Sequence, residues 1–175
     1  MESPVTLKEM LCFREGKVFL QNQLRNKHKE AVIVALGMNI PGPTKSSSFI
    51  SEAFAAGEDA LLLALEKNGL NILEEIEVKK KEGYLKIAAV ESKDATAVKR
   101  ITVSIEESHP LGRLFDMDVY DQEGKGIGRE VLGAPVRSCL LCKKEAKVCA
   151  RSRSHTVEEL YQYIETMIKA WLREK

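Results

Sequence analysis

One continuous apolar stretch near the start of the chain reads AVIVALGM, at residues 31–38. It is rich in β-branched side chains, and an uninterrupted apolar run of this length is typical of a strand that is buried on both faces. Residues 31–38 therefore predict a strand inside a sheet, and the segments on either side of this strand must supply its neighbours and its cover.

The segments around this strand predict two helices. Thr6 and Glu9 have the spacing of a capping box, in which each side chain satisfies a free amide at the start of a helix. Apolar residues continue from there at helical spacing, and we expect Gly16 to bend or interrupt the run. After the strand, a loop that contains two prolines is followed by serines at residues 46–48, which predict a second helix that runs to about Asn68.

Further along, the sequence predicts two hairpins and a third helix. Residues 72–90 form two strand patterns around Gly83, where glycine tolerates the backbone of a tight turn. Asp94 is expected to cap a helix that ends before residue 110. Residues 114–120 alternate between charged and bulky side chains, as in a strand. A turn then predicts that residues 126–132 return as the second strand of another hairpin.

The last helix and the fold class follow from the same patterns. Thr156 and Glu159 form a second capping box, ahead of an amphipathic helical stripe. A chain of 175 residues fits one domain that can bury a substantial core. We therefore predict an α+β fold, with a mixed or antiparallel sheet and flanking helices, as a single domain over residues 1–175.

Composition and charge exclude several classes of protein. The chain is 44% hydrophobic and 30% charged, as in globular proteins that stay in water. Its formal net charge of +1 argues against a nucleic-acid-binding or membrane-binding protein, because the summed field is close to neutral. Residues 1–16 lack the features of a signal peptide, and the apolar runs are too short to cross a bilayer. We therefore expect a cytoplasmic enzyme.

Two acidic residues in the strand at 114–120 form the first candidate site. Asp116 and Asp118 are two positions apart, so a strand directs both side chains to the same face. Neighbouring carboxylates repel each other unless a cation neutralises them, and Mg²⁺ takes one or two carboxylates while it keeps water and phosphate oxygens in its shell. The alternative is the solvent-facing half of an amphipathic strand that happens to carry two acids.

A second candidate site is a cluster of cysteines near the C-terminal end. Cys139 and Cys142 form a Cys-x-x-Cys pair, which can hold one side of a tetrahedral zinc site, and Cys149 with His155 can complete the four ligands. Their spacing is compact compared with zinc fingers. A cluster of reduced, partly buried thiols is the alternative.

Cationic side chains form the third group. Guanidinium groups bind phosphates bidentately, so several of them beside a metal suit a triphosphate donor. The candidates are Arg113, Arg129, Arg137, Arg151 and Arg153, together with His109 and His155. The alternative is that most of them are solvated surface residues. We favour Arg113 and Arg151 as exceptions, because their neighbours carry the resemblance described next.

Three sequence blocks resemble one known family. They read HPLGRLFDMDV at residues 109–119, GAPVRSCLLC at 133–142 and CARSRSH at 149–155. Their order and spacing are similar to those of the citrate lyase holo-acyl-carrier-protein synthase family (CitX), and the likeness extends over nearly the whole chain. The related malonate decarboxylase transferase has a similar Asp-x-Asp element, which is treated there as a nucleotidyltransferase signature.

The resemblance implies an activity, substrates and roles for the candidate residues. Family members move a phosphoribosyl-dephospho-CoA group from triphosphoribosyl-dephospho-CoA to a serine of the apo acyl carrier subunit of citrate lyase and release diphosphate. By this likeness Asp116 and Asp118 are the metal ligands. Our hypothesis for the mechanism adds that they hold Mg²⁺, that Arg113 acts in catalysis, that the other arginines bind substrate, and that either aspartate or His109 acts as the base. The fold would then be nucleotidyltransferase-like.

Two other functions remain open at this point. The same chemistry could act on the carrier subunit of malonate decarboxylase. A different class of protein is a non-catalytic zinc module that binds a partner through the basic, cysteine-rich segment at residues 137–153, which would attract an acidic surface.

Overall fold

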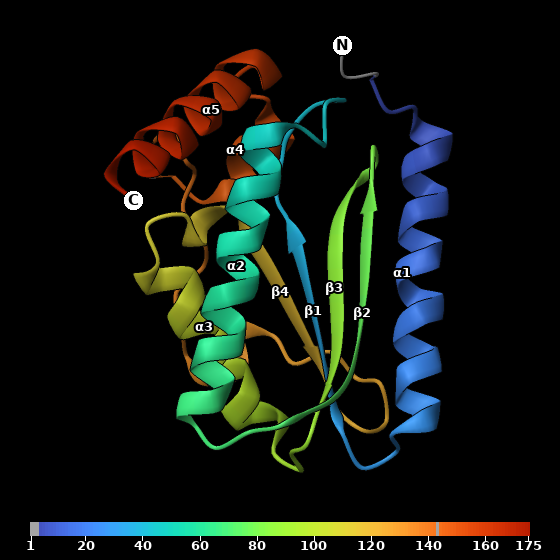
Figure 1. Cartoon of the computed structure of the whole chain (residues 1–175). Coiled ribbons are helices and arrows are strands. Elements are labelled where there is room, and N and C mark those ends of the chain that lie inside the picture. The colour runs from blue at the N-terminus through green and yellow to red at the C-terminus, as the bar shows by residue number, and fades with distance from the viewer. Residues whose placement is uncertain (1–3, 143) are drawn as a thin grey trace.

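The computed structural model describes residues 4–142 and 144–175, and four antiparallel strands form its centre. They are β1 (Val32–Met38), β2 (Ile72–Lys80), β3 (Gly83–Val90) and β4 (Phe115–Tyr120), in the spatial order β2-β3-β1-β4 (Figure 1). In β1, Ala35 lies opposite Ile87 of β3 on one side and Asp118 of β4 on the other. The apolar stretch that predicted an inner strand is thus confirmed as one, and β2 and β4 are the edges.

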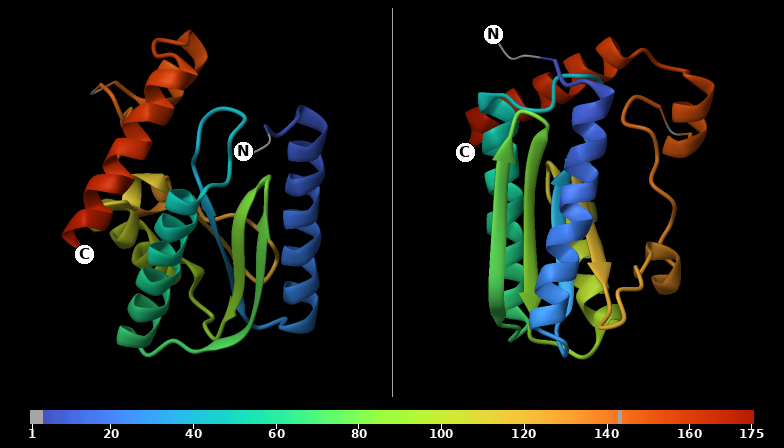
Figure 2. Two further views of the ribbon diagram at one scale, coloured as in Figure 1. Left: turned by 45° about the horizontal axis from the view of Figure 1, so that its top comes forward. Right: turned by 90° about the vertical axis from the view of Figure 1, so that its right-hand side faces the viewer.

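Helix α1 (Leu7–Lys27) covers one face of the sheet by itself, as the left view of Figure 2 shows. Its inner side packs Leu24 against Ile33 and Ile87, which are fully buried. The predicted capping box between Thr6 and Glu9 forms. The expected interruption in the middle of this helix does not occur, because α1 continues through Gly16 as one helix of 21 residues, and the cost of a single glycine is small against the packing of the rest.

The opposite face carries the larger core and the other long helices, α2 (Ser48–Lys67), α3 (Ala95–Ser108) and α5 (Val157–Glu174) (Figures 1 and 2). Their inner sides bury large side chains such as Phe54, Leu61 and Ile164 in this core, where α5 packs on α2. The α+β class with an antiparallel sheet and flanking helices is therefore confirmed. None of the helices in the described part of the chain has a long enough apolar stretch to span a membrane.

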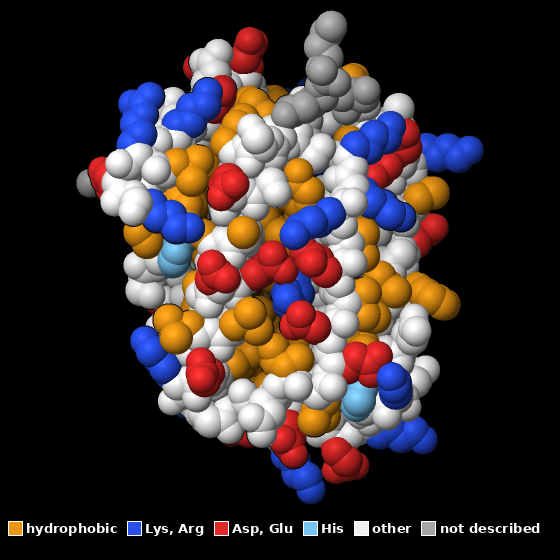
Figure 3. Space-filling view, viewed as in Figure 1, with side chains coloured by type: hydrophobic (Ala, Val, Ile, Leu, Met, Phe, Trp, Pro, Cys, Tyr) orange, Lys and Arg blue, Asp and Glu red, His pale blue; other side chains and the backbone are white. Residues whose placement is uncertain are grey.

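Charged side chains protect the β2 edge of the sheet. Lys86 of β3 is nearly buried, and its Nζ lies 2.9 Å from Glu75 Oε1 of β2 and 3.3 Å from Glu58 Oε1 of α2. Acidic and basic side chains gather in the middle of the face of the molecule that Figure 3 shows, in the same view as Figure 1. Charges on an edge strand discourage pairing with the strand of another molecule.

The predicted second hairpin is wrong. After β4 the chain makes a single bridge between Tyr120 and Gly126 and then forms a short 3-10 helix, η2 (Arg129–Leu132), where a strand was expected. In place of strand pairing, Arg129 forms an ion pair with Glu106 of α3, with its Nη2 2.7 Å from Glu106 Oε2. A further short helix that the sequence did not predict, α4 (Ala146–Ser152), precedes α5.

The start of β4 depends on a close backbone approach. A 3-10 turn, η1 (Gly112–Leu114), joins α3 to β4. A Cβ atom at Gly112 would lie 2.5 Å from the Glu106 carbonyl oxygen and 2.7 Å from that of Ile105, which is closer than Cβ atoms come to other atoms. Only glycine fits here without a shift, and this fit lets the chain enter β4 against the end of α3.

Candidate active site

Asp116 and Asp118 project from the same face of β4, the arrangement that their spacing predicts. Between and beside them, Phe115, Met117 and Val119 are at most 1% exposed and pack into the core on the side of α2 and α3. The side chains of Asp116 and Asp118 are 53% and 41% exposed. Because strand residues alternate between faces, both carboxylates lie on the α1 side of the sheet, on an edge strand that solvent can reach.

Lys17 joins this pair from α1. Its Nζ lies 2.6 Å from Asp118 Oδ2, and only 20% of its side chain is exposed. Burial lowers the pKa of Lys17, but the charge and the hydrogen bond of Asp118, together with Tyr120 and Asp116, raise it above the usual value overall. Lys17 is therefore a fixed cation beside the two carboxylates.

Asp116 is less well neutralised than Asp118. Its closest described cation is Arg137, whose Nη1 lies 3.9 Å from Asp116 Oδ1. About half of the Asp116 side chain is exposed. Partial loss of hydration on burial and the charge of Asp118 nevertheless raise the pKa of Asp116, against the opposing effects of Lys17 and Arg137. The pair thus keeps negative charge that these neighbours do not neutralise, and a hard divalent cation satisfies such a pair.

A buried carboxylate under β4 positions two of the predicted arginines. Glu106 of α3 is 4% exposed, accepts a hydrogen bond from the backbone amide of Met117 at 3.0 Å, and lies 2.7 Å from Arg129 Nη2. It also forms an ion pair with Arg137, which in turn donates to the Phe115 carbonyl oxygen at 3.0 Å. Through Glu106 the structure brings Arg137 and Arg129 to the strand that carries the aspartates.

Arg113 and Arg153 meet at a different place. They line one pocket of about 660 Å³, in which Arg113 donates to the Ser138 carbonyl oxygen. Burial, together with the charges of Arg137 and Arg129, lowers the pKa of Arg113. Arg151 is exposed on α4, outside the lining of this pocket.

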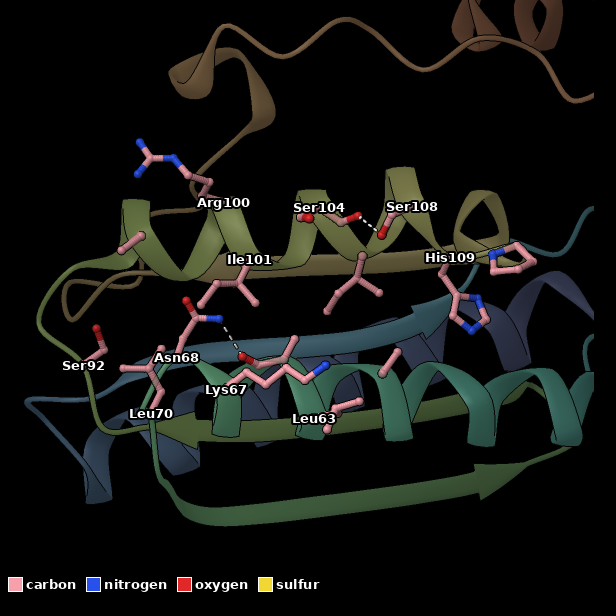
Figure 4. Close-up of a pocket in the computed structure, with 15 residues that line it drawn as sticks. Leu63, Lys67, Asn68, Leu70, Ser92, Arg100, Ile101, Ser104, Ser108 and His109 are labelled. Atoms are coloured by element: carbon pink, nitrogen blue, oxygen red, sulfur yellow. Dashed lines mark hydrogen bonds between the residues drawn. The ribbon is translucent and has the colours of Figure 1, made fainter.

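The structure does not bring His109 to the aspartates. Its ring lies 5.0 Å from the Phe115 ring and 5.9 Å from the Trp171 ring, and its Nδ1 accepts a hydrogen bond from the Leu111 amide at 3.0 Å. It lines a groove of about 700 Å³ between α2 and α3, on the opposite face of the sheet (Figure 4). Burial lowers the pKa of His109, so its neutral form is favoured.

The four predicted zinc ligands come together. One ligand atom from each of Cys139, Cys142, Cys149 and His155 lies within 4.8 Å of the others. The Cys142 and Cys149 sulfurs are 3.4 Å apart, and His155 Nε2 is 3.3 Å from Cys142 Sγ. In a tetrahedral zinc site with Zn–S bonds of about 2.3 Å, sulfurs are about 3.8 Å apart. The cluster can therefore hold a metal ion after small adjustments.

The thiols of this cluster influence one another, and against the opposing effect of burial the pKa of Cys139 is lowered by hydrogen bonds. Hydrogen bonding with Cys142 and burial raise the pKa of Cys149 to about 11. Three adjacent sulfurs do not all ionise by themselves, because their charges repel each other. A cation that binds thiolates removes this penalty.

Comparison with known proteins places the chain in a family. A family model described as apo-citrate lyase phosphoribosyl-dephospho-CoA transferase matches residues 5–171. The chain belongs to this family. A relative named as a probable transferase of this kind, from Vibrio cholerae serotype O1, is 34% identical over 163 residues, which is 93% of this chain and 91% of the relative. The transferase of Escherichia coli O8 is 35% identical over 167 residues, 94% and 88% of the two chains. The predicted resemblance is confirmed.

Sequence reasoning missed two residues beside this candidate site, Lys17 and Glu106. Lys17 and Asp118 are 101 positions apart, so no local pattern connects them. A signal was present, since Lys17 shares the inner stripe of α1 with Phe13, Leu20 and Leu24, where a charge needs a partner. Glu106 likewise lies on the buried side of the amphipathic helix α3.

Proposed function

We propose that this chain transfers the phosphoribosyl-dephospho-CoA group from its triphosphate donor to a serine of the apo acyl carrier subunit of citrate lyase, and that diphosphate is released. Membership of the family supports the reaction. The observation that carries the assignment of the active site is the pair Asp116 and Asp118, held on one face of an edge strand between Lys17 and Arg137.

Asp116 and Asp118 would hold Mg²⁺. The chemistry of the site fits this ion, because the carboxylates share a face, both are accessible, and Asp116 keeps unneutralised charge. When bound, Mg²⁺ supplies positive charge to the donor's phosphate oxygens.

Residues of the chain itself then position the donor and accept the proton of the carrier serine. Arg137 Nη1, 3.9 Å from Asp116 Oδ1, can donate to a phosphate oxygen of the donor beside the aspartates, and Lys17 adds a second positive charge. The carrier serine Oγ forms a bond to the α-phosphorus while the bond from that phosphorus to the diphosphate breaks. An aspartate of the pair accepts the serine proton, since His109 lies on the other face of the sheet.

Mass spectrometry of the carrier tests the function. The chain, the triphosphate donor and Mg²⁺ are incubated with the purified apo carrier subunit of citrate lyase, and in parallel with that of malonate decarboxylase. We expect the citrate lyase carrier to gain the mass of one phosphoribosyl-dephospho-CoA group as diphosphate appears. Modification of only the malonate decarboxylase carrier would reassign the substrate, and zinc content without any diphosphate release would favour a non-catalytic zinc module.

We also propose that Cys139, Cys142, Cys149 and His155 hold a structural Zn²⁺. Three sulfurs and one imidazole complete the four-coordinate shell that structural zinc prefers. Protein purified without chelators should contain about one zinc ion per chain, and a strong chelator should lower its melting temperature, because an ion that binds only the folded state stabilises that state.

Cysteine variants provide the control for this zinc prediction. Cys142→Ser should lose most of the zinc, as measured by elemental analysis. Cys12→Ser should retain it, because Cys12 is exposed on α1 outside the cluster. Equal zinc contents in the two variants would remove the cluster as the binding site.

A further inference from the structure

The pocket that contains Arg113 and Arg153 has the chemistry of a nucleotide site. Its volume of about 660 Å³ is within the range of small-molecule sites. Much of the wall is apolar, with Pro41, Leu140 and Leu160 among its lining residues, and the two arginines provide positive charge. Apolar walls of this kind accept a planar base, and guanidinium groups bind phosphates bidentately.

The charge of Arg113 indicates that the pocket accepts an anion. Its guanidinium is partly buried near Arg137 and Arg129, and the hydrogen bond that it donates within the pocket goes to a neutral acceptor, the Ser138 carbonyl oxygen. A bound phosphate would relieve the repulsion between these cations.

The pocket lies beside the end of β4 that carries Asp116. Asn39 lines it and donates from its backbone to the Leu114 carbonyl oxygen at 2.7 Å, directly before β4 begins. Gly37, two residues earlier in β1, pairs with Asp116. On the other side, Ser138 lines the pocket and directly follows Arg137, which reaches Asp116. A donor that extends from the pocket along this end of the strand would arrive at the aspartates.

We propose that this pocket binds the adenosine diphosphate part of the dephospho-CoA donor, with the base against the apolar wall and the diphosphate on Arg113 and Arg153. This assignment rests on the proposed function, since it takes the donor from there. The cysteine cluster forms part of the same wall through Cys139, Cys149 and His155, so the metal site also shapes the pocket.

Binding measurements on two pocket variants test this site. Ala150 lines the pocket from the exposed surface of α4, so Ala150→Trp should fill the pocket without disturbing the core. Arg153 has a left-handed backbone with φ of 49°, which asparagine tolerates, so Arg153→Asn removes the guanidinium group without straining the backbone. By calorimetry with 3′-dephospho-CoA and with ADP, we expect each variant to bind about 10- to 100-fold more weakly than the unaltered protein.

A matched control and a third ligand make the test decisive. Arg173→Asn removes the same charge from an exposed position near the end of α5, outside the pocket lining, and should bind as the unaltered protein does. Unchanged affinity in both pocket variants would overturn the assignment. So would a competition experiment in which pantetheine displaces 3′-dephospho-CoA and ADP does not. Zinc content and melting temperature show whether each variant is folded.

Failure of this site and failure of the function give different results. Suppose that the protein binds ADP, that Arg153→Asn weakens this binding, and that the protein modifies no carrier. The pocket assignment then stands and the proposed function falls. If the carrier is modified and both pocket variants keep the donor KM of the unaltered protein, the function stands and the pocket assignment falls.

Discussion

Replacing Asp116 or Asp118 with asparagine should lower the rate of transfer by about 10²- to 10³-fold, the size of effect seen when one preorganised group that stabilises transition-state charge is removed. Asparagine keeps the shape of the side chain but loses the charge that would hold a divalent ion. Among the described residues the cation nearest to Asp116 is Arg137, at 3.9 Å, and Arg137 is shared with Glu106, so the charge of Asp116 is the one most available for Mg²⁺. The measurement is the rate of carrier modification at saturating Mg²⁺, followed by mass spectrometry.

Stability measurements separate this effect from unfolding. The pKa of Asp116 is raised in the folded protein, so its ionised form is disfavoured there, and Asp116→Asn should not lower the melting temperature. Asp118→Asn should lower it slightly, because Lys17 loses its partner. Asp59→Asn, at an exposed position on α2, is the matched control and should leave both rate and stability unchanged. Retained activity in both site variants would remove the aspartates from the mechanism.

The fold was predictable where local patterns determine it. The inner strand at residues 31–38, the hairpin around Gly83 and the two capping boxes at Thr6 and Thr156 all form. Each of these signals involves residues a few positions apart. The second hairpin was not predictable in this way, because the contact that Arg129 makes in its place, the ion pair with Glu106, joins residues 23 positions apart in the sequence.

The same distinction applies to the site. The shared face of Asp116 and Asp118 follows from strand geometry alone, and the cysteine cluster from its short spacing. The cations beside the aspartates could not be found in this way, since Lys17 comes from α1. His109 illustrates the opposite error: it is only seven residues before Asp116, but the chain passes from α3 through η1 between them, and its ring packs on the other face of the sheet.

Glu106→Gln should destabilise the protein more than any other single-charge change considered above. The carboxylate is buried, holds Arg129 and Arg137, and accepts from the Met117 amide. Removing one partner of a buried ion pair leaves the other charges uncompensated and costs about 3–5 kcal/mol of unfolding free energy. For a chain of this size, that loss corresponds to a fall of roughly 6–20 °C in melting temperature. Differential scanning calorimetry measures it.

The neighbouring residue provides a matched control, because Glu107 also faces Arg129, at 3.7 Å, but its side chain is 50% exposed. Glu107→Gln should cost less than about 1 kcal/mol, since solvent screens exposed pairs. If Glu106 positions Arg137 for the donor, Glu106→Gln assayed well below its melting temperature should also raise the donor KM, whereas Glu107→Gln should not. Equal destabilisation by the two variants would show that Glu106 is no buried anchor. An unchanged KM in the folded Glu106→Gln variant would limit its role to stability and separate Arg137 from donor binding.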